Sequence, residues 1–250
     1  MKDELDLCDL YSFKIEQLKE IKAGLELGLD VSWYANPQFE IEQMEQIRFG
    51  LEQGVDVSVY ANPKFARWQM EQIKIGLKKG LDVSWYAKPE FDHNQMQEIR
   101  FGLEQNIDVS IYAKPEFNDY QMYQIRLGIE NNIDTSLYTN SQFDYDQMAE
   151  IRLGLEGRIN VSLYAKPEFN SWQMRQIRLG IEHKIDASSY ANSKFNHKQM
   201  KEIRLGLEKG FNVDEAIKLA YASNFYVFKS DSEKIKLCNE IIQLLDNLEK

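Results

Sequence analysis

Apolar and polar residues recur along the chain with a period of 26 positions. Methionine marks this period most clearly, because it returns in seven successive copies and leucine takes its place one period earlier. Such a period is typical of a repeat array, in which each copy packs against its neighbours, and not of a single globular core. The eight marking residues are Leu18, Met44, Met70, Met96, Met122, Met148, Met174 and Met200.

Each copy opens with the pattern of an amphipathic helix. In the fourth copy, Met96, Ile99 and Leu103 fall on one side of a helix with 3.6 residues per turn. Asp92 and Gln95 have the spacing of a capping box, which satisfies free amide groups in the first turn of a helix. The pattern therefore predicts a long helix that begins just after Asp92 and its equivalents.

The long helix is expected to end at a residue that tolerates the left-handed conformation. Glycine or asparagine takes this position in six copies, whereas Arg158 and Lys184 replace them in two and weaken the assignment there. The six better candidates are Gly28, Gly54, Gly80, Asn106, Asn132 and Gly210.

A second, much shorter helix is predicted from the segment Val-Ser-x-Tyr-Ala. An aspartate or asparagine precedes this segment in every copy, as an N-cap residue does, and all five prolines of the chain follow it. So short a helix is not stable alone and must pack on the long helices. The sequence thus predicts an all-α fold, an α-solenoid of eight 26-residue two-helix repeats with terminal capping helices.

Two further positions constrain the packing. Phe101 falls on the side of the long helix opposite to Met96, so we expect each long helix to be sandwiched between neighbours. Gly102 lies between these two sides, and glycine recurs there in all eight copies although it destabilises a helix interior by about 1 kcal/mol. We expect another backbone, that of the short helix, to approach this glycine closely; a kink is the alternative. The tyrosines from Tyr34 to Tyr190 are predicted to pack between helices.

The flanks of the array are predicted to cover its ends. The boundaries are an N-terminal cap over residues 1–12, the array over 13–212, and C-terminal capping helices over 213–250. The last of these helices spans about residues 231–248 and carries Cys238 in its apolar stripe. An aromatic run at 224–228 either packs within this cap or serves as an exposed docking segment.

Composition narrows the class of protein. The chain has 250 residues, 43 % of them hydrophobic and 28 % charged, with a net charge of −10. It has no apolar run of the ~20 residues that span a bilayer and no signal peptide, which predicts a cytoplasmic protein. The cysteines, Cys8 and Cys238, lie in opposite flanks and form no disulfide framework or metal cluster.

No pattern of residues predicts catalysis. The three histidines, His93, His183 and His197, are scattered over variable positions, and no glycine-rich phosphate loop occurs. Seven equivalent serines follow the N-cap of the short helix, whereas a catalytic serine would be one residue with one base. The sequence therefore predicts a non-enzymatic protein that needs no cofactor and no metal.

Charge is distributed unevenly between the two halves. Residues 1–125 carry 13 basic and 22 acidic side chains, whereas residues 126–250 carry 17 and 18. The acidic half disfavours long-range attraction of nucleic acid. It indicates either a solvated surface, a surface for a basic partner, or mimicry of the negative surface of a nucleic acid.

A row of basic residues occupies one position of every long helix. On a helical wheel the row falls outside both apolar stripes, so we expect it to face solvent. In one interpretation, each cation pairs with an acid four residues later in its own helix or with an acid in a neighbouring layer. In the other, the row binds a phosphate backbone or an acidic partner. The row comprises Lys22, Arg48, Lys74, Arg100, Arg126, Arg152, Arg178 and Arg204.

Large aromatic residues interrupt positions that are otherwise polar. Trp68, Tyr120 and Trp172 share one position of the long helix in alternate copies, and Tyr123 lies at a second variable position. Aromatic residues at such positions are typical of interface cores, although they could instead fill gaps between layers. The predicted binding residues are Arg48, Trp68, Arg100, Tyr120, Tyr123, Arg126, Arg152, Trp172, Arg178 and Arg204.

The string from Gln43 to Phe65 resembles short helical repeats of phage and mobile-element proteins from Gram-positive anaerobes. The resemblance extends over nearly all of residues 13–215 and transfers no catalytic residue. It implies a bacterial or viral intracellular setting and an interaction module that interferes with a host defence protein. The predicted function is therefore protein binding without catalysis; the alternative is binding of nucleic acid or a nucleotide signal along the basic row.

Overall fold

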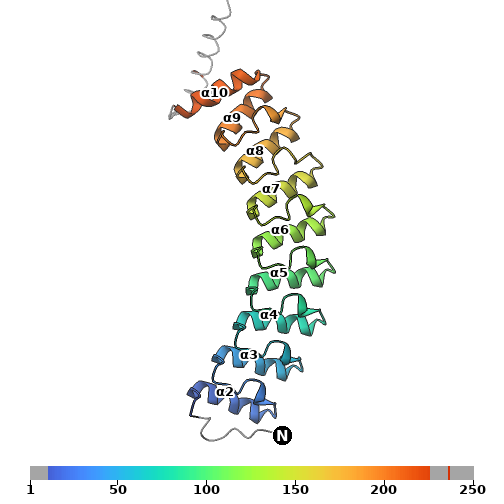
Figure 1. The fold of residues 1–250 in the computed structure, drawn as a ribbon, viewed down its shortest axis with the longest axis vertical. Coiled ribbons are helices and arrows are strands. Elements are labelled where there is room, and N and C mark those ends of the chain that lie inside the picture. The colour runs from blue at the N-terminus through green and yellow to red at the C-terminus, as the bar shows by residue number, and fades with distance from the viewer. Residues whose placement is uncertain (1–10, 226–235, 237–250) are drawn as a thin grey trace, which may run out of the picture. The chain divides into compact units, whose positions relative to one another are not determined.

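The structure is a computed structural model that describes residues 11–225 and residue 236. Within these residues it is an all-α solenoid without strands, and inside each of its two units each long helix packs on the next. The chain divides into two compact units, Met1–Glu130 and Asn131–Lys250, and each is described here by itself. Figure 1 shows the long helices stacked in chain order within each unit.

The first unit holds five long helices and four short 3-10 helices in its described part. Each long helix has twelve residues and each short helix has three. The long helices are α2 (Ile15–Glu26), α3 (Ile41–Glu52), α4 (Arg67–Lys78), α5 (His93–Glu104) and α6 (Asp119–Glu130). The short helices are η1 (Val31–Trp33), η2 (Val57–Val59), η3 (Val83–Trp85) and η4 (Val109–Ile111).

The second unit continues the same pattern and ends in a different helix. Its described elements are η5 (Thr135–Leu137), α7 (Tyr145–Glu156), α8 (Ser171–Glu182), η6 (Ala187–Ser189), α9 (His197–Glu208) and α10 (Val213–Phe225). The copy between α7 and α8 has a turn where the others have a 3-10 helix, yet Asn160 still accepts a bond from the amide of Ser162 (3.0 Å).

The ends of the long helices confirm the predicted boundaries. In α5, the amide of Ile107 donates to the carbonyl of Gly102 (2.9 Å) and Asn106 has a φ of 57°, the left-handed geometry that closes a helix. Arg158 and Lys184 adopt the same conformation, with φ of 56° and 61°. The helix therefore ends at these two residues as well, although neither favours that conformation by itself.

Residues shared by all copies form the core. The repeated methionine, isoleucine and tyrosine are fully buried, and the phenylalanine before each long helix is almost so, except Phe195 in the last copy. Each inner long helix contacts both neighbours, as α5 contacts α4 and α6, which confirms the predicted sandwich. The second stripe is half-buried, and Phe49 and Phe101 lie beside basic side chains. The apolar core therefore lies on one side of each long helix.

The repeated glycine makes room for a side chain and not for a backbone. A methyl group on Gly102 would overlap the hydroxyl oxygen of Tyr112 and would lie 2.9 Å from Cγ1 of Val109. The Tyr112 hydroxyl donates to the carbonyl of Glu98 (3.2 Å), one turn before the glycine. The predicted approach of the short helix is thus correct, but its tyrosine and valine, and not its main chain, fill the space.

The final helix shows why the array stops. In the last copy Ala216 of α10 stands where the other copies have the buried tyrosine, and its Cα lies 3.4 Å from a methyl group placed on Gly206. The longer helix α10 packs directly against α9. Helix α10 is thus a lengthened form of the short helix.

Several predictions lie outside the described residues. These are residues 1–10 of the predicted N-terminal cap, both cysteines, residues 226–228 of the aromatic run and the final helix over about residues 231–248. Among the described helices, none combines the length and the apolar character needed to cross a membrane.

A buried glutamine joins each layer to the next. In the copy of α5, Oε1 of Gln95 accepts from the amide of Asp92 (2.8 Å), which is the predicted capping-box bond. Its Nε2 donates to the carbonyl of Phe117 (2.6 Å), in the following layer. Equivalent interlayer bonds start at Gln17, Gln43, Gln69, Gln147 and Gln173.

We predict that Gln95→Leu lowers the free energy of unfolding by about 2–4 kcal/mol, because it leaves a buried amide and a buried carbonyl without partners. Urea denaturation followed by circular dichroism measures the change. Asn94→Ala, at an exposed neighbouring position, is the control and should change stability by less than about 0.5 kcal/mol. Equal stability of Gln95→Leu and the parent would contradict the role of the glutamine.

We also predict that Gly102→Ala destabilises the protein by about 1–3 kcal/mol through overpacking, although alanine is the better helix former. Adding Tyr112→Phe removes the hydroxyl that the new methyl group meets. The double variant should therefore lose less stability than the sum of the two single variants. Simple additivity in the same denaturation assay would argue against this contact.

Candidate functional site

The basic row is tied to two layers at once. In the first unit, Nε of Arg126 donates to Glu98 of the preceding layer (2.9 Å), and Nη1 donates to Glu130 of its own helix. In the second unit, Arg178 does the same with Glu150 (2.8 Å) and Glu182 (2.6 Å). The structure thus uses both predicted pairing modes, within the helix and across layers.

The expectation that the basic row faces solvent is wrong for its arginines, because they are largely covered. Arg100, Arg126 and Arg204 are only 6–7 % exposed, and Arg48, Arg152 and Arg178 expose little of their side chains. The helical wheel missed this because it treats one helix, whereas the adjacent layer covers the guanidinium. The planar groups also lie over rings: Cζ of Arg100 is 4.7 Å from the centre of Phe101.

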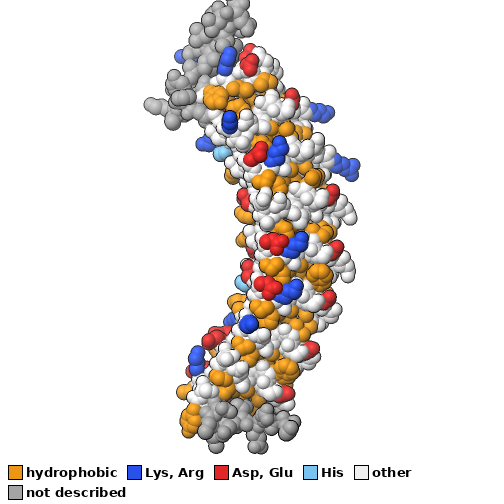
Figure 2. Space-filling model, in the orientation of Figure 1, with side chains coloured by type: hydrophobic (Ala, Val, Ile, Leu, Met, Phe, Trp, Pro, Cys, Tyr) orange, Lys and Arg blue, Asp and Glu red, His pale blue; other side chains and the backbone are white. Residues whose placement is uncertain are grey.

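The partner across the layer is an acid in some layers and an amide in others. Arg48, Arg126 and Arg178 bond to a glutamate, whereas Lys74, Arg100 and Arg204 bond to Gln46, Gln72 and Gln176. Burial opposes the charge of Arg126, but Glu98 and Glu130 outweigh it and raise its pKa. Arg48, Arg126 and Arg178 are therefore charge-neutralised links between layers. Figure 2 shows acidic and basic side chains in adjacent pairs on the visible face.

The predicted aromatic residues behave differently from the basic row. Trp68, Tyr120, Tyr123 and Trp172, which we call the outer aromatic residues, lie on the long helices α4, α6 and α8 and are between 40 and 59 % exposed. Exposure of this extent does not fit residues that fill gaps in the core. The structure therefore separates the ten predicted residues into buried arginines and exposed aromatic side chains.

The two tryptophans share one local arrangement. The ring of Trp68 lies 6.4 Å from that of His93 in the next layer, and the ring of Trp172 lies 5.9 Å from that of His197. The guanidinium of Arg67 lies 4.2 Å over the Trp68 ring, and its buried Nε has no hydrogen-bond partner. Each indole is thus held at the surface by neighbouring rings or cations and is pre-organised for contact.

Trp172 forms one wall of a recess of about 140 Å³ in the second unit. Asp146, Ala149 and Glu150 of α7 line it together with Ser171 and Arg175 of α8. Glu150 is bound to Arg178, which leaves Asp146 as the exposed carboxylate beside the indole. The recess offers an aromatic wall next to charged groups of both signs, as interface hot spots do.

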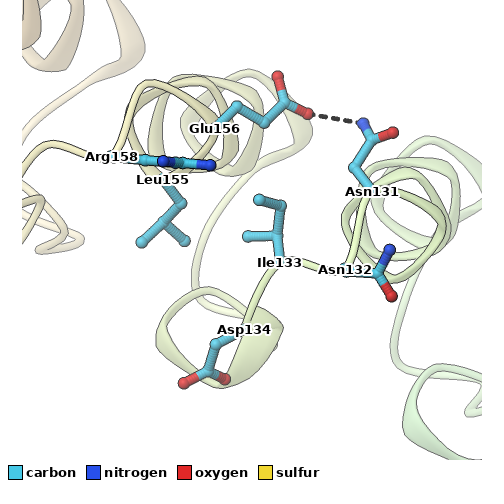
Figure 3. A pocket seen from close by; sticks show the side chains of 7 residues that line it. All are labelled: Asn131, Asn132, Ile133, Asp134, Leu155, Glu156 and Arg158. Carbon is cyan, nitrogen blue, oxygen red and sulfur yellow. Dashed lines mark hydrogen bonds between the residues drawn. The ribbon is translucent and has the colours of Figure 1, made fainter.

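A larger recess of about 520 Å³ lies at the ends of two long helices in the second unit (Figure 3). Its charged groups have structural roles: the amide of Asn131 donates to Glu156 (2.9 Å), and Asp134 caps the short helix. None of its lining residues is a serine, cysteine, histidine or lysine. The residues that line it are Asn131, Asn132, Ile133, Asp134, Leu155, Glu156 and Arg158.

The three histidines contact different partner residues and do not lie together. His93 and His197 lie against tryptophans, and Nδ1 of His183 lies 2.8 Å from a carboxylate oxygen of Glu208. Burial favours the neutral form of Glu208, but its bonds to His183 and Arg204 outweigh this and lower its pKa. In the described part of the chain, no group of three or more His, Cys, Asp or Glu could hold a metal ion.

Sequence reasoning missed a second set of exposed apolar residues. Trp33, Trp85 and Leu137 end three of the short helices and are all exposed, and Tyr145 is exposed at the start of α7. The signal was present in the varying residue of Val-Ser-x-Tyr, which is Trp, Val, Trp, Ile, Leu, Leu and Ser in successive copies. A variable apolar residue within an otherwise fixed segment indicates a surface position.

The fold defines an α-solenoid assembled from short two-helix repeats. No family model, curated protein or solved structure matches this chain significantly.

We predict that Arg126→Gln lowers the free energy of unfolding by about 2–3 kcal/mol, because it leaves Glu98 buried without its cation. Glu98→Gln should cost less than about 1 kcal/mol, since glutamine already takes this position as Gln72 and Gln176 in the layers that precede Arg100 and Arg204. Urea denaturation compares the two. Equally small effects would mean that Arg126 is not a structural tie.

Proposed function

We propose that this chain is a non-enzymatic protein-binding solenoid that contacts its partner through the outer aromatic residues. The observation that carries the proposal is their exposure of 40–59 % at positions that are polar in other copies, such as Asn94 and Lys198. A soluble surface gains nothing from exposed indole and phenol rings in itself. In interfaces, by contrast, Trp and Tyr supply much of the binding energy.

The separation of structural positions from exposed positions within each copy supports the same function. The glutamine, methionine, tyrosine, glycine and arginine positions hold layers together, which leaves the exposed positions free to vary without loss of the fold. The arginines belong to this scaffold, so our proposal keeps the aromatic residues of the predicted site and removes Arg48, Arg100, Arg126, Arg152, Arg178 and Arg204 from direct contact.

The same geometry argues against the nucleic-acid alternative. Binding along a phosphate backbone requires cations that can exchange their counterions for phosphates. Here the guanidiniums are buried and already paired with glutamates, and the chain carries a net charge of −10. A protein partner fits this surface better.

The resemblance to repeats of phage and mobile-element proteins supports a bacterial host protein as the partner, with inhibition of a defence protein as the proposed outcome and the cytoplasm as the proposed location. This part of the proposal rests on the resemblance alone.

We predict that replacing the aromatic residues abolishes partner recognition without unfolding the array. A display library of bacterial protein fragments is selected against the immobilised full chain, and the recovered fragments are measured by biolayer interferometry. Trp68→Asn with Tyr120→Asn, and separately Trp172→Lys, should weaken binding at least about tenfold, because they remove the aromatic contacts. The variants should keep the fold, because asparagine and lysine occur naturally at this position as Asn94 and Lys198.

The matched control is Asn94→Ala, which changes the same position in a layer without an aromatic residue. Its binding should equal that of the parent, and circular dichroism should show the same helix content for all variants. Fragments that bind the aromatic variants as tightly as the parent would overturn the proposal.

A further inference from the structure

The short helices of the first unit place an apolar side chain at the surface of each layer. Trp33, Val59, Trp85 and Ile111 end η1 to η4 and form a set that we call the short-helix row. Trp33 and Trp85 are 41 and 37 % exposed, and Val59 and Ile111 are half-buried. Because successive layers repeat one arrangement, equivalent residues follow one another along the stack (Figure 1).

The fold does not require an apolar residue here. In the second unit the same position is Ser189, and the short helix η6 still forms, with its cap Asp186 bonded to the amide of Ser188 (3.1 Å). Val83 of η3 and Tyr86 directly after it supply the buried contacts instead. The two tryptophans therefore add apolar surface that packing of the layer does not explain.

Carboxylates accompany the short-helix row in every layer. Asp30, Asp56, Asp82 and Asp108 cap η1 to η4 and are exposed, and no residue of these short helices is basic. Bonds from the side chain and the amide of Ser110 lower the pKa of Asp108, so its carboxylate stays charged at neutral pH. Residues 11–130 carry 13 basic and 19 acidic side chains, a net charge of −6.

The spacing of layers fits one kind of occupant. Packed helices lie about 8–10 Å apart, so the short-helix row offers one apolar side chain about every 10 Å. An α-helix rises 1.5 Å per residue, and every seventh residue returns to one side after about 10.5 Å. A helix that lies along the stack could thus set one apolar residue per heptad against each layer.

We propose that the short-helix row binds a basic amphipathic helix of a partner protein, with leucine-like side chains against Trp33, Val59, Trp85 and Ile111 and lysine or arginine beside the capping aspartates. This surface differs from that of the outer aromatic residues, so the inference goes beyond the proposed function. Apolar contact supplies the affinity, and the charges select a basic partner over an acidic one.

The probe is a synthetic amphipathic peptide of four heptads. Each heptad has leucine at two positions, and all charged residues of the peptide are lysines. Its binding to the full chain is measured by isothermal titration calorimetry at 50 and 200 mM salt. Two control peptides replace lysine by glutamate or shuffle the order of residues. We expect saturable binding of the lysine peptide only.

The chain supplies its own conservative variants. Trp33→Ser with Trp85→Ser copies Ser189, and Asp56→Asn, Asp82→Asn and Asp108→Asn together copy the cap Asn160, so both variants should fold. The first should weaken peptide binding about tenfold or more, and the second at least about threefold, with a smaller salt dependence. Circular dichroism verifies the fold of each.

Trp68→Asn with Tyr120→Asn is the control that separates the two surfaces, and it should leave peptide affinity within about twofold. If the variants of the outer aromatic residues bound the display-selected fragments as tightly as the parent, the proposed function would fail, but the peptide-binding result would still stand. No saturable binding of the lysine peptide, equal binding of the glutamate or shuffled peptide, or full affinity after Trp33→Ser with Trp85→Ser would each overturn the inference.

Discussion

The structure depends on one buried side chain per layer, the glutamine of the first helical turn. In α5, Gln95 accepts from the first amide of its own helix and donates to Phe117 of the next layer. An unsatisfied group at either end would cost about 1–3 kcal/mol, so the start of each helix and its contact with the next layer are set together. The stacking register follows from this coupling: a layer that slipped would leave the amide of Gln95 and the carbonyl of Phe117 without each other.

Two further ties build on that register, on different sides of the long helix. On the core side, the tyrosine hydroxyl reaches a carbonyl such as that of Glu98 across the space that Gly102 leaves open. On the other side, Arg126 joins Glu98 and Glu130 and covers part of an otherwise exposed ring. Both need residues of fixed length at fixed spacing, which explains why five positions of each copy change so little while their neighbours change freely.

The sequence correctly predicted the features that repeat and that depend on residues close together in the chain. The capping pairs, the helix ends and most of the short helices follow from rules that act within a few residues, and the structure has them as predicted. Arg158 adopts the left-handed conformation although its residue type had weakened that assignment. Sequence reasoning failed where contacts between separate helices decide the outcome. Arg100 falls on a polar side of its own helix yet is covered by the preceding layer, and the space at Gly102 belongs to the Tyr112 hydroxyl, which no single-helix pattern reveals.

The same division explains how such an array could acquire binding surfaces at little cost to stability. Each layer contacts its nearest neighbours, so a change at an exposed position is felt within one or two layers and not by the whole chain. The chain already contains this variation: serine replaces tryptophan at Ser189, and asparagine replaces the capping aspartate at Asn160, while the surrounding bonds persist. The exposed tryptophans therefore need a reason other than folding, and contact with another molecule is the reason that their chemistry favours.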